Sequence, residues 1–285
     1  MTSQITPASD SGTQHRLSVR GLGKSYGSGP STTRIIEDLT FDVAAGEIVC
    51  IVGPSGVGKT TLLKCLTGLQ PVSSGAAYID GVPIQGPPEE MALVFQEYTR
   101  SLMPWLTVRK NVALPLKHLR LSARERDERV DEAITAVGLE HAVDGFPWEL
   151  SGGMQQRVAI ARSLAYRPEV LVMDEPFASV DAQTRFELED LCLRIRDRFS
   201  MTIVVVTHDI DEAVYLSDRV VVLGSRPAVV TEVLDVGLPS PRDQIATRAL
   251  PAFATLRSEI LSHIREGRIP TATIRTQQKK RRRGR

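Results

Sequence analysis

The sequence of 285 residues has no apolar stretch long enough to span a membrane, since its longest apolar runs have the length of single strands. The first fifteen residues are polar and contain no apolar leader segment, which argues against secretion. Cysteine is scarce, because Cys50, Cys65 and Cys192 are the only three and are isolated from one another. We therefore expect reduced cysteines in the core of a cytosolic protein, not disulfides or metal ligands.

Net charge is also nearly absent, because 35 Lys and Arg residues face 34 Asp and Glu residues. The balance hides a basic end, since residues 279–283 and Arg285 supply six cations and leave 29 basic against 34 acidic residues elsewhere. We expect residues 1–15 and the basic tail 271–285 to be disordered. By charge alone, the tail would also suit anionic lipid or RNA.

The clearest positive signal is a glycine-rich segment that matches the phosphate-binding pattern G-x-x-x-x-G-K-[ST] at every fixed position. It consists of Gly53, Pro54, Ser55, Gly56, Val57, Gly58, Lys59 and Thr60, and Thr61 follows. An apolar run precedes it and apolar residues at helical spacing follow it, so we expect a strand, a loop and a helix. Glycines let backbone N–H groups turn toward a polyphosphate, and the helix start adds its positive dipole end. Lys59 is expected to reach the β- and γ-phosphates, and Thr60 to bind Mg²⁺.

Two further segments narrow the function. The segment Leu150-Ser151-Gly152-Gly153 predicts the start of a helix with Ser151 as its N-cap. This helix start is either an ordinary capped terminus or a second anion-binding site. An apolar strand at 170–173 ends in Asp174 and Glu175. In a protein with a phosphate-binding loop, Asp174 is expected to bind Mg²⁺ and Glu175 to act as a general base. The alternative is that the two carboxylates belong to a solvated turn after the strand.

Together these motifs resemble the ATP-binding subunit of ATP-binding cassette (ABC) transporters, over about residues 16–230. Further positions match family landmarks in the expected order: Tyr26 for stacking on adenine, Gln96 for linking Mg²⁺ to the transporter interface, Asp181 in the loop after the catalytic strand, and His208 for contact with the γ-phosphate. The resemblance implies ATP and Mg²⁺ as cofactors. It implies that Glu175, His208, Gln96 and Lys59 act in catalysis, and that Thr60, Gln96 and Asp174 hold the metal. It also implies that the signature residues Ser151, Gly152, Gly153 and Gln155 close over ATP bound by a second copy of the chain, and that Asp181 contributes to ATP binding.

The implied fold class is α/β, a P-loop NTPase core with an N-terminal antiparallel β layer and a helical signature subdomain. We expect the ABC ATPase domain at 16–240, with its helical subdomain at about 98–165, and a C-terminal helical extension at 241–270. Ser122 and Glu125 form a capping-box pattern and Gly138 a helix stop. A hairpin turn is expected at 80–81, and further segments alternate as strand and helix.

An apolar segment at 102–108, with Pro104 and Trp105 at its centre, is similar to a segment of importers for nitrate, sulfonates and taurine. The residues Arg226-Pro227 fit that subgroup too. We expect its apolar cluster, Leu102-Met103-Pro104-Trp105, to be exposed and to contact a transmembrane permease. The alternative is a locally packed loop. The resemblance implies a peripheral protein on the cytoplasmic face of the membrane that serves a permease and, indirectly, a solute-binding protein. The alternative is an ABC ATPase that acts on nucleic acid, as in repair or chromosome maintenance. Only the basic tail supports it, so we prefer the importer and expect no nucleic acid as a partner.

Overall fold

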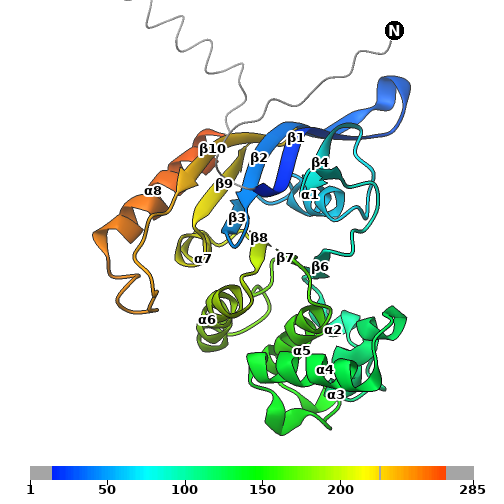
Figure 1. The fold of residues 1–285 in the computed structure, drawn as a ribbon. Helices are drawn as coiled ribbons and strands as arrows, with labels where there is room; N and C mark the ends of the chain where they lie inside the picture. Colours follow the sequence, from blue (N-terminus) through cyan, green and yellow to red (C-terminus); the bar gives the residue numbers. More distant parts are fainter. Residues whose placement is uncertain (1–14, 225, 268–285) are drawn as a thin grey trace, which may run out of the picture.

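The computed structural model describes residues 15–224 and 226–267 (Figure 1). The predictions of disorder at 1–15 and 271–285 lie outside this range, apart from His15, which begins the first strand. The strands are β1 (His15–Tyr26), β2 (Thr33–Ala44), β3 (Ile48–Val52), β4 (Ser74–Ile79), β5 (Val82–Pro83), β6 (Met91–Val94), β7 (Val170–Asp174), β8 (Thr202–Val206), β9 (Arg219–Gly224) and β10 (Val229–Asp235). The helices are α1 (Lys59–Leu66), α2 (Tyr98–Ser101), α3 (Val108–Ala113), α4 (Ala123–Val137), α5 (Gly152–Ala165), α6 (Ala182–Phe199), α7 (Ile210–Leu216) and α8 (Pro251–Glu266).

The centre of the molecule is a six-stranded sheet with the order β10-β9-β3-β8-β7-β6. The five strands from β9 to β6 run parallel, and β10 pairs antiparallel with β9 at one edge. Strands β3, β7 and β8 are buried at every residue, which agrees with their apolar sequences, interrupted only by Asp174 at the end of β7 and Thr202 at the start of β8. This sheet places the ends of four parallel strands at one edge, where the site described below lies.

A second, antiparallel sheet has the order β2-β1-β4-β5 and covers helix α1, which lies between the two sheets (Figure 1). The predicted turn at 80–81 joins β4 to β5, with Gly81 at a positive φ of 78°. One apolar cluster fills the space around α1, and a larger one packs the other face of the central sheet against the helices. The predicted antiparallel β layer and α/β fold class are confirmed.

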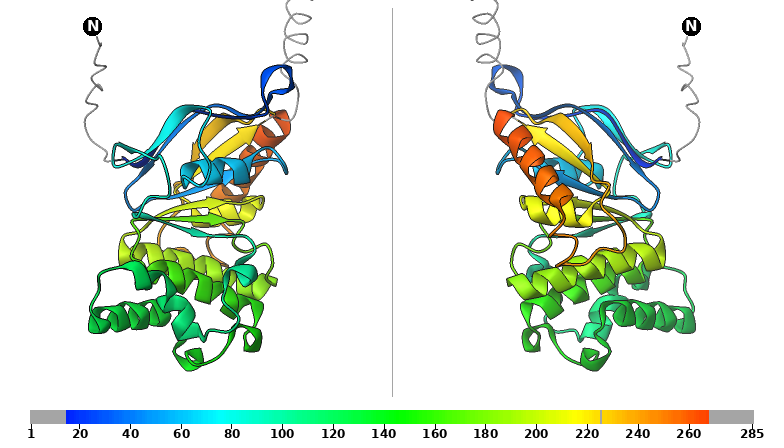
Figure 2. Two further views of the ribbon diagram at one scale, coloured as in Figure 1. Left: turned by 90° about the vertical axis from the view of Figure 1, so that its right-hand side faces the viewer. Right: turned by 90° about the vertical axis from the view of Figure 1, so that its left-hand side faces the viewer.

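The helical subdomain projects from the β6 edge of the sheet and contains α2 to α5 (Figures 1 and 2). Ser122 and Glu125 form the predicted capping box at the start of α4, and Gly138 ends that helix at a φ of 73°. The buried positions of α4 are the predicted stripe: Val130, Ala133, Ile134 and Val137. Across residues 15–224 and 226–267, no helix combines the length and the apolar character needed to cross a membrane.

The C-terminal part of the described chain returns across the molecule as a loop and the amphipathic helix α8. Helix α8 packs beside α7 and β9 (Figure 2). Its buried residues are Phe253, Ile260 and Ile264. The three cysteines are free and buried, as the sequence predicts. Burial raises the pKa of the Cys50 thiol well above its usual value, which agrees with a packing role.

Candidate functional site

Four predicted site segments meet at one edge of the central sheet because each follows a parallel strand. The glycine-rich loop follows β3, Gln96 follows β6, Glu175 follows β7 and His208 follows β8. Ligands of open α/β sheets bind at such carboxyl edges. The fold thus explains how residues more than 150 positions apart in the sequence form one site.

The glycine-rich loop leads directly into helix α1, whose first turn contains Lys59, Thr60 and Thr61. Gly58 adopts a φ of 122° at the helix start, a conformation that residues with a side chain rarely adopt. Lys59 is buried, and its ammonium donates to the carbonyl of Gly53 at 2.9 Å. Burial lowers the pKa of Lys59, and the carboxylates of Glu175 and Asp174 act in the opposite direction. These two carboxylates keep a cation favourable at this buried position.

Glu175 connects the predicted catalytic residues. Its Oε2 atom accepts a hydrogen bond from Gln96 Nε2 at 3.0 Å and lies 3.2 Å from His208 Nδ1. Glu175 has a φ of 43°, an uncommon conformation for a residue other than glycine, and its N–H donates to the carbonyl of Val206 at 2.7 Å. Strained backbone of this kind gathers at functional sites. The structure therefore brings Gln96, Glu175 and His208 into one contact group, a geometry that sequence order alone does not give.

Asp174 is the last residue of β7, and its side chain forms a hydrogen bond with the hydroxyl of Thr60. Its Oδ1 atom is buried and has no hydrogen-bond partner among the described residues. Burial raises the pKa of Asp174, and the hydrogen bond with Thr60 and the nearby Lys59 act against that rise. A buried carboxylate oxygen without a partner, beside a hydroxyl, has the chemistry that a hard divalent cation prefers.

A cavity of about 750 Å³ opens over the glycine-rich loop. One wall consists of loop and helix residues from Ser55 to Thr61, together with Glu175, and the other includes Thr32, Thr33, Arg34, Ile35, Arg226 and Pro227. The sequence does not indicate that this second wall belongs to the site, because it comes from the start of β2, the preceding Thr32 and the β9–β10 connection, and Arg226-Pro227 is recognisable only as a feature of the importer subgroup. Tyr26 does not line the cavity, although it pairs with Thr33 in the sheet, and its hydroxyl donates to Gln70 Oε1 at 2.7 Å.

The predicted residues Ser151, Gly152, Gly153, Gln155 and Asp181 lie at the starts of α5 and α6 and do not line this cavity. Ser151 caps α5, since its hydroxyl accepts from the N–H of Met154 at 3.3 Å, and Asp181 caps α6 through Thr184. Ser151, Gly152 and Asp181 are exposed, whereas Gly153 is buried and a Cβ built on it would lie 2.3 Å from a Thr184 methyl group. In one copy of the chain, these residues are thus separate from the glycine-rich loop.

The segment 102–108 is partly packed and partly exposed. The prediction that its whole apolar cluster is exposed is wrong for Leu102, which is only 3% exposed and packs in the core. Trp105 is 68% exposed, and Pro104 is exposed beside it. The buried amide of Asn111 holds the segment, since it donates to the carbonyl of Leu106 at 2.9 Å and bonds the backbone of Met103 in both directions. Trp105 therefore stands on a fixed loop.

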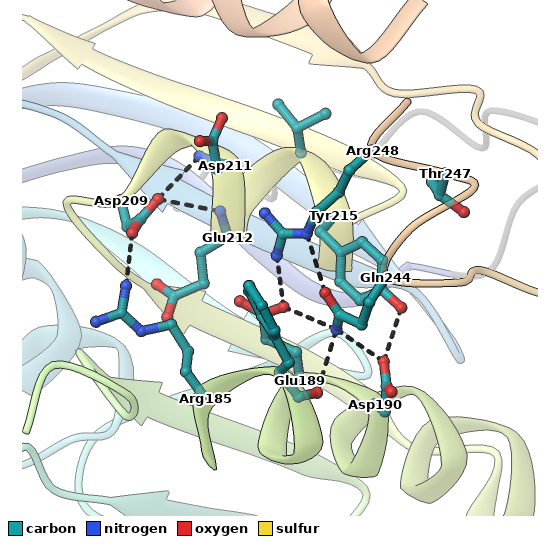
Figure 3. A network of polar contacts seen from close by, with 12 residues as sticks. Arg185, Glu189, Asp190, Asp209, Asp211, Glu212, Tyr215, Gln244, Thr247 and Arg248 are labelled. Atoms are coloured by element: carbon teal, nitrogen blue, oxygen red, sulfur yellow. Dashed lines mark hydrogen bonds and ion pairs between the residues drawn. The ribbon is translucent and has the colours of Figure 1, made fainter. Parts of the chain in front are cut away.

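A polar network connects the C-terminal segment to α6 and α7, the helices that follow Asp181 and His208 (Figure 3). Arg248 donates to the buried carboxylate of Glu189 at 2.6 Å and lies over the ring of Tyr215 at 4.8 Å. Gln244 donates to both Glu189 and Asp190. Burial raises the pKa of Glu189, and Arg248 and Gln244 counter that rise. Helices α6 and α7 and the C-terminal segment therefore share one charge network around the buried Glu189.

The model of the family described as ABC transporter matches residues 36–178. The nitrate import ATP-binding protein of Synechococcus elongatus is 44% identical over 246 residues, which cover 85% of this chain and 89% of that protein. The chain belongs to the ABC transporter family. The aliphatic sulfonates import ATP-binding protein of Bacillus licheniformis is 42% identical over 245 residues, covering 86% of this chain and 92% of that protein.

Among solved structures, a dimeric ATP-binding cassette in a post-hydrolysis state with bound ADP and Pi superposes with a TM-score of 0.67. It is 30% identical in sequence, and the match covers 77% of this chain and 98% of that structure. The family and the fold implied by the sequence resemblance are thus confirmed, and the ATP-binding character of the family extends to this chain.

Proposed function

We propose that the chain is the ATP-hydrolysing subunit of an importer that takes up a small anion of the nitrate or sulfonate type through a partner permease. The observation that carries the proposal is the contact of Glu175 with both Gln96 and His208 beside a Lys59-containing phosphate loop. Relatives named as nitrate and sulfonate import subunits support the importer class over the nucleic-acid-linked alternative.

In the proposed reaction, water attacks the γ-phosphorus of ATP, the bond to the β-phosphate oxygen breaks, and ADP leaves. Glu175 orients the water and accepts its proton, because its side chain lines the same cavity as the phosphate loop. Lys59 and the N–H groups at the start of α1 offset the negative charge that develops on the phosphate oxygens. His208, held 3.2 Å from Glu175, orients the terminal phosphate.

Thr60, Asp174 and Gln96 are the residues proposed to hold Mg²⁺. The fit rests on the partnerless Oδ1 atom of Asp174 and on its neighbour, the Thr60 hydroxyl. The bound cation would neutralise phosphate charge, and one carboxylate with one hydroxyl is a typical protein share of such a site.

The complete site is proposed to form between two copies of the chain. Ser151 and its neighbours Gly152, Gly153 and Gln155, together with Asp181, would close over ATP held by the partner's phosphate loop. Their position outside the cavity of a single copy supports this arrangement. The similar structure reported as a dimer with ADP and Pi provides a precedent in another protein.

The exposed Trp105 on its fixed loop is the proposed permease contact. Large aromatic side chains are typical anchors of protein interfaces, and the loop follows Gln96 closely enough to sense the state of the site. The chain would then act on the cytoplasmic face of the membrane as a peripheral subunit. A solute-binding protein would deliver the anion to the permease, so the anion would not contact this chain.

The test of the proposed chemistry is Glu175→Gln. The amide keeps the shape of the side chain but cannot accept a proton, so ATP hydrolysis should fall by at least about 100-fold while ATP binding remains. Gel filtration with ATP and Mg²⁺ should then show accumulation of a dimer. Hydrolysis close to that of the wild type would exclude Glu175 as the base.

A further inference from the structure

Arg226 lies against the phosphate loop although it comes from the connection between β9 and β10. It lines the cavity together with Gly56, Lys59 and Glu175. A Cβ built on Gly56 would lie 2.3 Å from Arg226 Nη2, so the guanidinium occupies the space next to that glycine. In the sequence, Arg226 stands out only as a feature of the importer subgroup.

The backbone beside Arg226 is anchored to the second wall of the cavity. The N–H of Ala228 donates to the carbonyl of Ile35 at 2.8 Å, and the carbonyl of Ala228 accepts a hydrogen bond from the backbone N–H of Glu37 at 2.9 Å. Ala228 is fully buried. The arginine is therefore only two residues from a fixed point, which reduces the backbone entropy lost when this connection binds a ligand.

The charges around Arg226 point to an anionic ligand. Within residues 15–224 and 226–267, Arg226 forms no ion pair with a carboxylate, whereas Arg34 on the same cavity wall pairs with Glu37. Glu175 and Asp174 lie near Lys59 and balance its charge, and the positive end of the α1 dipole lies at the same loop. Arg226 would therefore gain an anionic partner when negative charge enters the cavity. A polyphosphate would supply that charge, and a guanidinium matches phosphate oxygens with two parallel N–H bonds.

We propose that Arg226 is a second side-chain cation that binds the phosphate chain of the nucleotide, in addition to Lys59. The inference rests on the proposed function, because it assumes that this cavity binds ATP. It assigns a ligand-binding role to the β9–β10 connection, which lies outside the residues matched by the family model.

The test compares Arg226→Ala and Arg226→Lys with the wild-type chain in full length, using calorimetry for ATP and ADP and ligand-observed NMR for adenosine. Arg226→Ala should weaken the binding of ATP and ADP by about 10-fold or more, the range of a hydrogen-bonded charge contact, and should leave adenosine binding unchanged. Arg226→Lys should recover part of the affinity, because it restores the charge without the two-pronged geometry. Arg124→Ala removes an exposed arginine of α4 and serves as the matched control, with affinities expected to equal those of the wild type.

Two results would overturn the inference. Affinities for ATP and ADP within about twofold of the wild type would show that Arg226 does not contact phosphate. An equal loss for adenosine would show that the substitution deforms the cavity instead. Lys59→Ala separates these results from failure of the proposed function. If neither the wild type nor any variant binds ATP, the assignment of the nucleotide site is wrong. If ATP affinity falls only in Lys59→Ala, the role of Arg226 alone is refuted.

Discussion

Arg248→Met should destabilise the protein strongly, because it leaves a buried carboxylate without its cation. Glu189 is 1% exposed, its Oε2 atom lies 2.6 Å from Arg248, and its Oε1 atom has no hydrogen-bond partner among the described residues. Gln244 would be the remaining donor to Glu189. Removing one partner of a buried ion pair typically costs about 3–5 kcal/mol, and we expect a loss of this size in the free energy of unfolding.

The loss should depend on pH in a defined direction. Burial raises the pKa of Glu189 in the folded chain, so its contribution to stability is fully present below the ordinary carboxylate pKa and is lost as pH rises through the raised value. Removing Arg248 removes a charge that lowers this pKa, so the pKa rises further. The deficit of Arg248→Met should therefore be larger near about pH 8 than near about pH 5.

Urea unfolding followed by circular dichroism provides the assay, with two comparison variants. The double variant Glu189→Gln/Arg248→Met removes the charge together with its partner and should regain more than half of the lost stability. Arg257→Met breaks an exposed pair between Arg257 of α8 and Asp211 of α7, and should change stability by at most about 1 kcal/mol. A single variant as stable as Arg257→Met, or a double variant no better than Arg248→Met, would refute the reasoning.

Two further predictions concern the proposed assembly. Lys59→Ala and Ser151→Ala should each abolish most ATPase activity. A mixture of the two variants should regain part of the activity, because a mixed dimer contains one intact ATP site. An inactive mixture with verified mixed dimers would contradict ATP sites shared between two copies, unless both sites must act together. Trp105→Ala should weaken co-purification with the permease and solute uptake while ATP binding persists, and Trp148→Ala, which removes a tryptophan of similar exposure, is the control. Equal retention of the permease by both tryptophan variants would exclude Trp105 as the contact.

The local parts of the fold and site could be predicted from the sequence because short-range geometry determines them. The phosphate loop depends on glycine conformations within eight residues, and the Ser122 capping box on a spacing of three. Arg226 and Glu189 could not be placed in this way. Their partners lie far away in the sequence, in the phosphate loop and in Arg248, and only the completed sheet and helix packing bring them together.

The error at Leu102 has the same origin. An apolar run next to a proline gives no sign of which side chain turns inward. The packing of Leu102 depends on the helices of the subdomain, and the loop shape depends on four bonds of Asn111 with backbone that follows residue 102. Tertiary contacts of this kind have no local pattern, so exposure within a short apolar segment has to be taken from the structure.

The order of the central sheet has a consequence for how the protein is made. Strand β3, which carries the phosphate loop, pairs only with β8 and β9 among the described strands, and β8 begins at Thr202. During synthesis, β3 therefore has two unpaired edges until about 150 further residues have left the ribosome, and long-range parallel pairing of this kind is slow. The matched stretch 36–178 contains neither neighbour of β3, so a fragment with those limits would expose both strand edges and should aggregate rather than bind nucleotide.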